Sequence, residues 1–346
     1  MKEITWKRYP WIIKVESAQT WIQIQHNLGL APNTVEAYAR ALNEFIKFCA
    51  DREITVTLAK KEHVALYVRN LLSRSHLRPN KPAADKPSLG LANATIHQRL
   101  TAIRLFYDFL IEEGRREINP VGRGRRAPIL GLGISGIRGL VPRYHKLPRI
   151  PTDEEWRAII GAIREESLRN RFMFVLSYDA ALRREELCSL QTNDIDPAHR
   201  TVRVRAETTK SRRTRVVPFS STAAQLYHCY LNHRRSISTA RGPLFISESR
   251  RNKGQGVSKW SWSKIILALS NRSGVEHFST HTLRHVCLTD LARDGWDLHD
   301  IATFAGHTSI QTTLIYIHLS GRDLAEKLAA GMDAIHARRL RQMESL

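Results

Sequence analysis

The sequence has 346 residues, which is more than one hydrophobic core usually organises, so we expect two domains. Hydrophobic residues make up 42% of the chain and charged residues 25%, a composition that excludes a chain disordered throughout. The 54 Lys and Arg residues outnumber the 33 Asp and Glu residues and give a formal net charge of +21, which predicts a polyanionic partner.

Anionic lipid is an alternative to a soluble polyanion. Binding to a membrane would require a spanning segment, a lipidation signal or a basic amphipathic helix with a broad apolar face, and the sequence has none of these. The apolar run Trp11–Ile13 is too short for the hydrophobic region of a signal peptide. We therefore expect a cytoplasmic protein without a membrane partner.

The four cysteines are spread along the chain without CxxC spacing. In so large a chain this argues against a disulfide framework and against a zinc ribbon, and it favours buried reduced thiols. The cysteines are Cys49, Cys188, Cys229 and Cys287.

Three segments of the N-terminal half have apolar residues at helical spacing. They are Thr34–Ala50, Lys61–Arg74 and Thr95–Gly114. We therefore predict an all-helical domain over residues 17–115, preceded by an N-terminal extension over residues 1–16.

The segment 116–150 that follows is rich in Gly, Pro and Arg and is predicted to be a linker. Between Gly114 and Pro151, Glu117 is the single acidic residue. The excess of positive charge favours a segment that follows a phosphate backbone, although a merely solvated tether remains the alternative. The basic residues are Arg115, Arg116, Arg123, Arg125, Arg126, Arg138, Arg143, Lys146 and Arg149.

A second domain is predicted over residues 151–346. Thr152 is a candidate N-cap, because acidic residues follow it directly and stabilise a helix N-terminus. Apolar and basic residues alternate over 202–205 and the apolar pattern returns over 215–219, which predicts a two-stranded hairpin with a basic tip. Further helices are predicted near Thr222–Arg235, Ser258–Ser270, Thr280–Arg293, Leu298–Phe304 and Asp323–Arg341.

Four stretches of this domain carry polar residues that core packing does not require. "ALRREELCSL" holds Arg183 and Glu186, three residues apart on a helical turn, where a carboxylate can orient a guanidinium. The hairpin tip holds Lys210. Each pattern also has an ordinary explanation, namely a surface salt bridge in the first case and a solvated turn in the second.

The other two stretches are "HTLRH" and "FAGHTSIQTTLIYIH". His281 and His285 in the first have a spacing that could bind zinc, but the acidic residue of an HExxH arrangement is missing, so no metal is expected. The second holds His307 and Tyr316. Taken alone, Tyr316 could equally be a core aromatic of a helix.

In combination these residues suit attack on a phosphodiester. Arg183 and Arg284 can hold its non-bridging oxygens with directed donors and without a metal. Tyr316 can serve as the nucleophile, because cationic neighbours favour the phenolate. Lys210 can protonate the departing sugar hydroxyl, and His281 and His307 can share proton handling.

The order Arg, Lys, His-x-x-Arg, His, Tyr resembles the tyrosine recombinase (phage integrase) family. "ALRREEL" is similar to the first arginine box of the family, and "HTLRH" with "GHTSIQTTLIYIH" is similar to the second. Ala181 stands where the family often has Gly, and Lys210 lacks a glycine often found beside the family's lysine. The resemblance implies a catalytic set without a cofactor, made of Arg183, Lys210, His281, Arg284, His307 and the nucleophile Tyr316, with Glu186 supporting Arg183.

The resemblance also implies a fold and partners. It implies a mainly α protein, in which an all-helical core-binding domain and a mainly helical catalytic domain with a small β-hairpin or sheet clamp double-stranded DNA. DNA contacts are expected from Arg123, Arg125, Arg126, Arg212, Arg213 and Arg215.

Further implications concern assembly. A 3′-phosphotyrosyl intermediate and a homo-tetramer on two DNA sites are expected, with possible accessory DNA-bending proteins. The C-terminal helix would be exchanged between protomers, with packing on its own domain as the alternative. A mobile element is the suggested context. A type IB topoisomerase-like enzyme and a binding-only DNA regulator are the rival functions.

Overall fold

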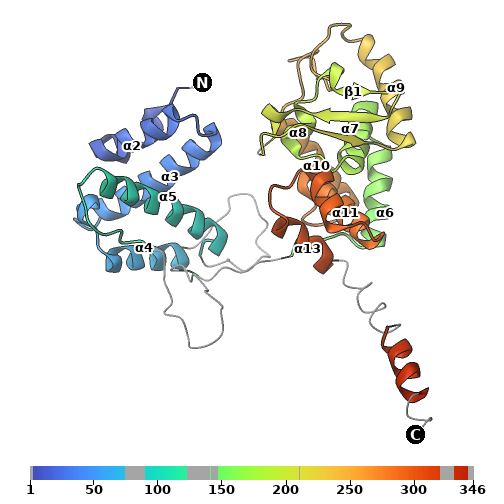
Figure 1. The fold of residues 1–346 in the computed structure, drawn as a ribbon. Helices are drawn as coiled ribbons and strands as arrows, with labels where there is room; N and C mark the ends of the chain where they lie inside the picture. Colours follow the sequence, from blue (N-terminus) through green and yellow to red (C-terminus); the bar gives the residue numbers. More distant parts are fainter. Residues whose placement is uncertain are drawn as a thin grey trace. The chain divides into compact units, whose positions relative to one another are not determined.

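The computed structural model describes residues 3–74, 90–122, 141, 147–209, 211–319 and 331–341, without the side chains of His318 and Leu319. It divides into two compact units, 1–145 and 146–346 (Figure 1). The described part of unit 1 is all helical. Its elements are η1 (Trp6–Arg8), α1 (Pro10–Ile13), α2 (Glu16–Asn27), α3 (Pro32–Ala50), η2 (Val56–Leu58), α4 (Lys61–Ser73) and α5 (Asn93–Glu112).

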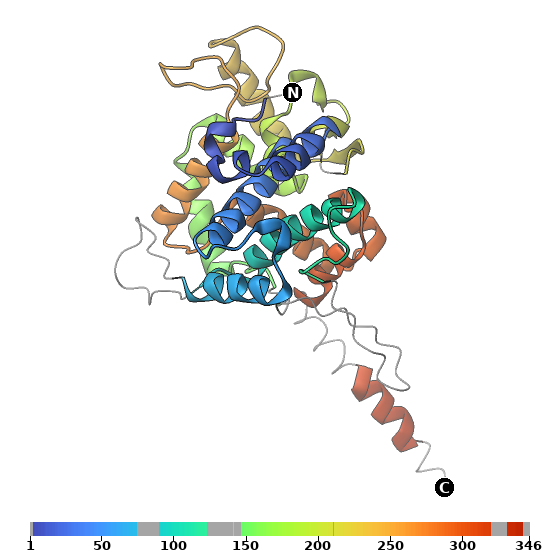
Figure 2. The same cartoon turned by 90° about the vertical axis from the view of Figure 1, so that its left-hand side faces the viewer.

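The core of unit 1 lies where α3 packs against α5 (Figure 1), and the rotated view in Figure 2 shows the same helices. Phe45 of α3 and Phe106 of α5 are fully buried, and each such side chain contributes about 1.5–3 kcal/mol through the hydrophobic effect. The three helices predicted from apolar spacing are confirmed as α3, α4 and α5.

The N-terminal residues differ from the sequence-based expectation. Tyr9 and Ile12 are buried in the same apolar cluster as the helices of unit 1, because α1 packs on α3. The segment 1–16 is therefore not an extension outside the domain over its described residues. The helix α2 was also not predicted.

Unit 2 is mainly helical with one small sheet. Its elements are α6 (Asp153–Arg164), α7 (Leu168–Asp179), α8 (Arg184–Cys188), η3 (Thr192–Asp194), β1 (Ile195–Asp196), β2 (Thr201–Val204), η4 (Ala206–Thr208), β3 (Arg215–Pro218), α9 (Ser221–Arg235), α10 (Lys259–Ser273), α11 (Thr280–Arg293), α12 (Leu298–Ala305) and α13 (Gln311–Leu319). Residues 331–341 are also helical. The predicted fold class is confirmed.

The sheet is antiparallel with the order β1-β2-β3. The predicted hairpin is present, and Val202 of β2 pairs with Val217 of β3 in its register. Both valines are buried, while Arg203 and Val216 on the other face are exposed, as the alternation along a strand requires. The third strand, β1, was not predicted because it has only two residues.

The helix α11 is central to the site, because it packs against α7, α12 and α13. Its buried face includes Leu283, Val286 and Leu288. The start of α6 matches the prediction, since the Thr152 hydroxyl accepts a hydrogen bond from the backbone N–H of Glu155. None of the described helices is long and apolar enough to span a bilayer.

Candidate active site

The N-terminus of α8 carries a buried carboxylate between two arginines. Glu186 is fully buried, and its Oε2 accepts a hydrogen bond of 2.9 Å from the backbone N–H of Arg183. Its Oε1 accepts a further bond of 2.8 Å from Arg183 Nη1. The contact expected from the spacing of these two residues is therefore present, and it fixes the direction of the Arg183 guanidinium.

Arg215, the first residue of β3, holds the same carboxylate from the other side. Its Nη1 donates to Glu186 Oε1 at 3.1 Å and its Nη2 to Oε2 at 2.7 Å. Burial raises the pKa of Glu186, but the bonds from Arg215 and Arg183 outweigh it and hold that pKa at about 2. The Arg215 side chain is only 9% exposed and belongs to this cluster, while its expected contact with DNA stays a prediction.

Arg284 of α11 is the most buried cation of the site, with 3% of its surface exposed. It donates to the carbonyl of Ala181, to that of Ala305 at 2.6 Å, and to Nε2 of His307 at 2.9 Å. Burial, with the nearby Arg183, lowers its pKa to about 10, so it remains a cation at neutral pH. Arg183 donates to the carbonyl of Gly306, so the two guanidiniums converge on the end of α12.

Ala181, whose carbonyl accepts a hydrogen bond from Arg284, follows the end of α7 and has an uncommon backbone conformation. Ala181 has φ +45°, in the left-handed region that glycine adopts most readily. It is fully buried, so its methyl group also contributes to the packing around the site. Ala181 stands where the resembling family often has Gly, and it still adopts the backbone turn that presents this carbonyl to Arg284.

His307 follows Gly306, whose φ of +64° ends α12 in a left-handed C-cap. A guanidinium can only donate, so His307 Nε2 accepts from Arg284 and the ring hydrogen is assigned to Nδ1, which donates to Thr313 Oγ1 at 2.9 Å. Burial, followed by the charge of Arg284, lowers the pKa of His307 to about 3. The imidazole is therefore neutral at physiological pH.

Tyr316 of α13 is 2% exposed, and its ring stacks on that of His307 with centroids 6.2 Å apart and an angle of 4° between the planes. Its hydroxyl lies 3.0 Å from Nδ1 of His285 on α11. Burial raises the pKa of Tyr316, and the charges of Arg284 and Arg183 oppose this only in part. The expectation that cationic neighbours favour the phenolate is thus corrected for this state: the phenol is protonated.

The remaining predicted residues are either exposed or lie outside the residues that the structure describes. His281 is exposed on the first turn of α11, with its ring 6.2 Å from that of His285. Arg212 and Arg213 are exposed before β3. Lys210, Arg123, Arg125 and Arg126, as well as residues 323–330 of the predicted C-terminal helix, lie outside the described residues.

The sequence reasoning considered His285 only as a partner of His281 in a zinc site. Its four-residue spacing from His281 showed that both share a helix face, but no sequence signal connects it with a tyrosine in another helix. Within the described ranges no group of three His, Cys, Asp or Glu side chains has an arrangement that could hold a metal ion.

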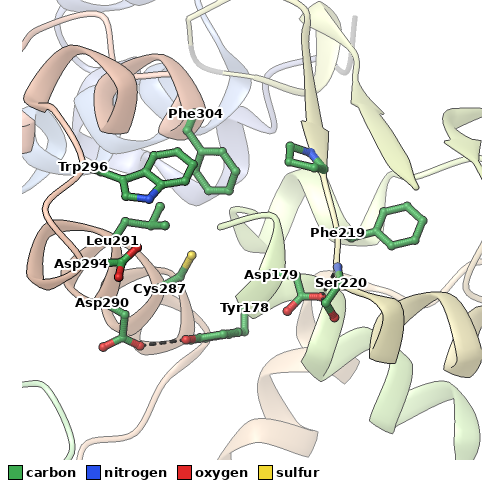
Figure 3. Close-up of a pocket in the computed structure, with 11 residues that line it drawn as sticks. Tyr178, Asp179, Phe219, Ser220, Cys287, Asp290, Leu291, Asp294, Trp296 and Phe304 are labelled. Carbon is green, nitrogen blue, oxygen red and sulfur yellow. Dashed lines mark hydrogen bonds between the residues drawn. The ribbon is translucent and has the colours of Figure 1, made fainter. Parts of the chain in front are cut away.

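A separate hollow of about 520 Å³ lies in unit 2 and is lined in part by residues of α11 (Figure 3). The rings of Trp296 and Phe304 form one apolar wall, with centroids 6.1 Å apart. The Tyr178 hydroxyl and Asp290 Oδ2 lie 2.8 Å apart at the base. Other lining residues are Asp179, Pro218, Phe219, Ser220, Cys287, Leu291 and Asp294.

Comparisons with known proteins find similar sequences over both units of the chain. Residues 150–322, half of the chain, match the phage integrase family, and residues 19–114 match the phage integrase N-terminal SAM-like domain. The chain is 28% identical over 333 residues to tyrosine recombinase XerC of Proteus mirabilis, with 95% of each chain covered. It is 27% identical to XerC of Thermodesulfovibrio yellowstonii, with 86% of this chain and 89% of the relative covered.

Two solved structures share the fold. The XerH site-specific recombinase bound to palindromic difH substrate has a TM-score of 0.65 and 20% identity, over 90% of this chain and 82% of the other. The Tn1549 transposon integrase in complex with transposon right end DNA has a TM-score of 0.63 and 16% identity, over 90% of this chain and 99% of the other.

Proposed function

The chain belongs to the phage integrase family and is a tyrosine-type site-specific recombinase, and we propose that it cleaves and rejoins DNA strands through a 3′-phosphotyrosyl bond to Tyr316. One observation carries this proposal. The stacked pair Tyr316 and His307 lies against Arg284, and Arg183 reaches the same turn at the end of α12.

The two arginines are suited to hold a scissile phosphate. Arg284 uses three N–H groups for Ala181, Ala305 and His307 and has Tyr316 as a further partner, while Arg183 uses two for Glu186 and Gly306. A guanidinium has five such groups, so donors remain for the non-bridging oxygens. These donors oppose the negative charge that develops on the phosphate during in-line attack. Lys210 is proposed to protonate the departing 5′ oxygen.

The burial of Tyr316 implies a conformational change before strand cleavage. A phosphate cannot reach a phenol that is 2% exposed, so side chains or segments that cover Tyr316 must move when DNA binds. We propose that the DNA phosphate draws the Tyr316 hydroxyl toward the guanidiniums. Before this step the buried, protonated phenol is not placed to attack a phosphate, which limits unwanted cleavage.

DNA is the proposed polyanion. A formal net charge of +21 and the exposed Arg212 and Arg213 support binding to the phosphate backbone. Arg123, Arg125 and Arg126 are proposed to contribute from the basic linker. The affinity for duplex DNA should therefore fall with salt, with a slope of log K against log salt of roughly −0.9 for each phosphate neutralised. A slope near zero would contradict DNA binding of this kind.

Assembly into a homo-tetramer on two DNA sites is proposed because each protomer offers one nucleophile while exchange involves four strands. Every side chain of the helix 331–341 is exposed, including Met332, Ile335 and Leu340. A helix of this length is marginal in water without packing. We propose that it docks into the hollow of Figure 3 on a neighbouring protomer, where its basic residues would meet the acidic residues of the lining.

A nicked suicide substrate tests the function. The wild-type protein should form a covalent protein–DNA adduct, while Tyr316→Phe should bind the same DNA without forming one. An adduct that persists in Tyr316→Phe would overturn the assignment. Relaxation of supercoiled DNA by a monomer without site preference would favour a type IB topoisomerase-like enzyme, and binding without any cleavage would favour a DNA regulator.

The biological setting is part of the same proposal. The long basic segment 116–150 supports a role for a mobile element, and cytoplasmic action is expected. Sequencing the DNA joined to the protein in cells would test this, because ends of one element should recur at the junctions. Recovery of a single chromosomal site without element ends would contradict it.

A further inference from the structure

The Tyr316 hydroxyl has a partner outside the predicted catalytic set. His285 Nδ1 lies 3.0 Å from the phenol oxygen, and the two rings have centroids 5.8 Å apart. The contact joins α11 to α13 across 31 positions of sequence. Since His285 directly follows Arg284 on α11, the same helix presents a cation and an imidazole to one phenol.

The chemistry of the neighbours fixes the direction of this hydrogen bond. The charges of Arg284 and Arg183 act on the phenol oxygen, and guanidiniums attract its lone pairs because they can only donate hydrogen bonds. The single phenolic hydrogen is therefore directed to His285, whose Nδ1 accepts it as a lone pair. The neutral ring then carries its hydrogen on Nε2.

The other histidine in contact with Tyr316 cannot take this role. His307 uses Nε2 to accept from Arg284 and Nδ1 to donate to Thr313. Both of its nitrogens are therefore committed, although its ring stacks on the phenol. His285 is the histidine whose hydrogen bond to the nucleophile leaves the phenol lone pairs facing the cations.

We propose that His285 accepts the phenolic proton of Tyr316 during strand cleavage, an assignment that rests on the proposed function. As the bond from the Tyr316 oxygen to phosphorus forms, the O–H bond breaks and its proton moves to His285 Nδ1. The bond from phosphorus to the 5′ oxygen breaks, and that oxygen receives a proton from a separate acid, for which Lys210 is proposed. Rejoining reverses each transfer, so His285 returns the proton to the departing phenol.

The surroundings of His285 keep its imidazole neutral and therefore able to accept a proton. Burial, followed by the charges of His281 and Arg284 on its own helix, lowers the pKa of His285 to about 4, so the imidazole is neutral at neutral pH and its Nδ1 lone pair can accept the phenolic hydrogen. From the elements packed against it, Tyr316 of α13 and His307 face the ring. A bound phosphate diester brings a negative charge to this group, which raises the pKa of His285 and strengthens it as a base.

The substitution His285→Asn separates proton transfer from positioning. The amide oxygen of Asn can still accept a hydrogen bond from the phenol, but an amide is not a base at neutral pH. In single-turnover cleavage of a nicked suicide substrate, His285→Asn should bind DNA as the wild type does and form the adduct about 100-fold more slowly. Added imidazole should restore part of the rate in His285→Ala.

His299→Asn is the matched control, because His299 is exposed on α12 and should leave the rate unchanged. An adduct rate in His285→Asn within twofold of the wild type would overturn the role of His285, while leaving the proposed function intact if Tyr316→Phe stays inactive. Absence of any wild-type adduct would overturn the proposed function and this inference together. Circular dichroism and DNA affinity check that both Asn variants are folded.

Discussion

Glu186 and Arg215 face each other through two parallel hydrogen bonds, of 2.7 and 3.1 Å, between a fully buried carboxylate and a guanidinium 29 residues further along the chain. Because Glu186 also binds Arg183, the carboxylate couples β3, the returning strand of the hairpin, to an arginine of the proposed active site. The bidentate geometry restricts both guanidiniums.

Removing this charge should destabilise the protein. In Glu186→Gln the guanidinium of Arg215 stays buried without a counter-ion, and breaking a buried ion pair from one side costs about 3–5 kcal/mol. We expect the free energy of unfolding, measured by chemical denaturation, to fall by this amount and the adduct rate to fall with it. A loss below about 0.5 kcal/mol would show that the pair does not stabilise the fold.

The same carboxylate predicts the acid sensitivity of the protein. Its pKa is about 2 in the folded state, against an ordinary value of 4.5, so its stabilising effect is present above pH 4.5 and is lost as the pH falls toward 2. The full loss amounts to about 3 kcal/mol. Denaturation curves between pH 6 and 3 should therefore show a steeper decline for the wild type than for Glu186→Gln, and parallel declines would contradict this assignment.

Gly306 should not tolerate a side chain. An added Cβ would lie 3.0 Å from Arg215 Nη1, which Glu186 holds in place, and φ is +64°. Gly295 also has positive φ, at +87°, but an added Cβ there meets nothing within 4 Å. Both Ala variants should lose about 1 kcal/mol from backbone strain, and Gly306→Ala should lose a further 1–3 kcal/mol from overpacking. Equal losses in thermal or chemical denaturation would argue against the contact with Arg215.

Thr313 should matter through its hydroxyl. In Thr313→Val the Nδ1–H of His307 loses its acceptor inside the protein, which costs about 1–3 kcal/mol. The exposed neighbour Thr312 offers a matched control with the same change of shape on the same helix. Denaturation should show a loss for Thr313→Val and a change within about 0.5 kcal/mol for Thr312→Val. Similar values for both would mean that the hydroxyl of Thr313 is dispensable.

Much of the fold could be predicted from local patterns. Regular apolar spacing was sufficient for α3, α4 and α5, and alternation was sufficient for the hairpin. The helix α13 was missed because Thr312, Thr313, Ile315 and Ile317 are β-branched and have low helix propensity, so packing on α11 and α12 stabilises it instead. Such tertiary support leaves little trace in a single sequence.

The sequence indicated which residues form the candidate site, but it did not indicate their protonation states or their contacts with each other. The motifs indicated Arg183, Arg284 and Tyr316, but the balance between burial and charge at the phenol depends on the folded surroundings. The inward turn of Arg215 and the contact of Tyr316 with His285 depend on contacts between distant segments. Sequence spacing reports neither of these.

The identity of the residue joined to DNA tests the central claim most directly. After trapping on a nicked suicide substrate, the adduct can be digested with protease and nuclease and the nucleotide-bearing peptide sequenced by mass spectrometry. The account predicts one modified peptide, with the nucleotide attached through its 3′ phosphate to Tyr316. A phosphate on any other residue, or a link through a 5′ phosphate, would contradict it.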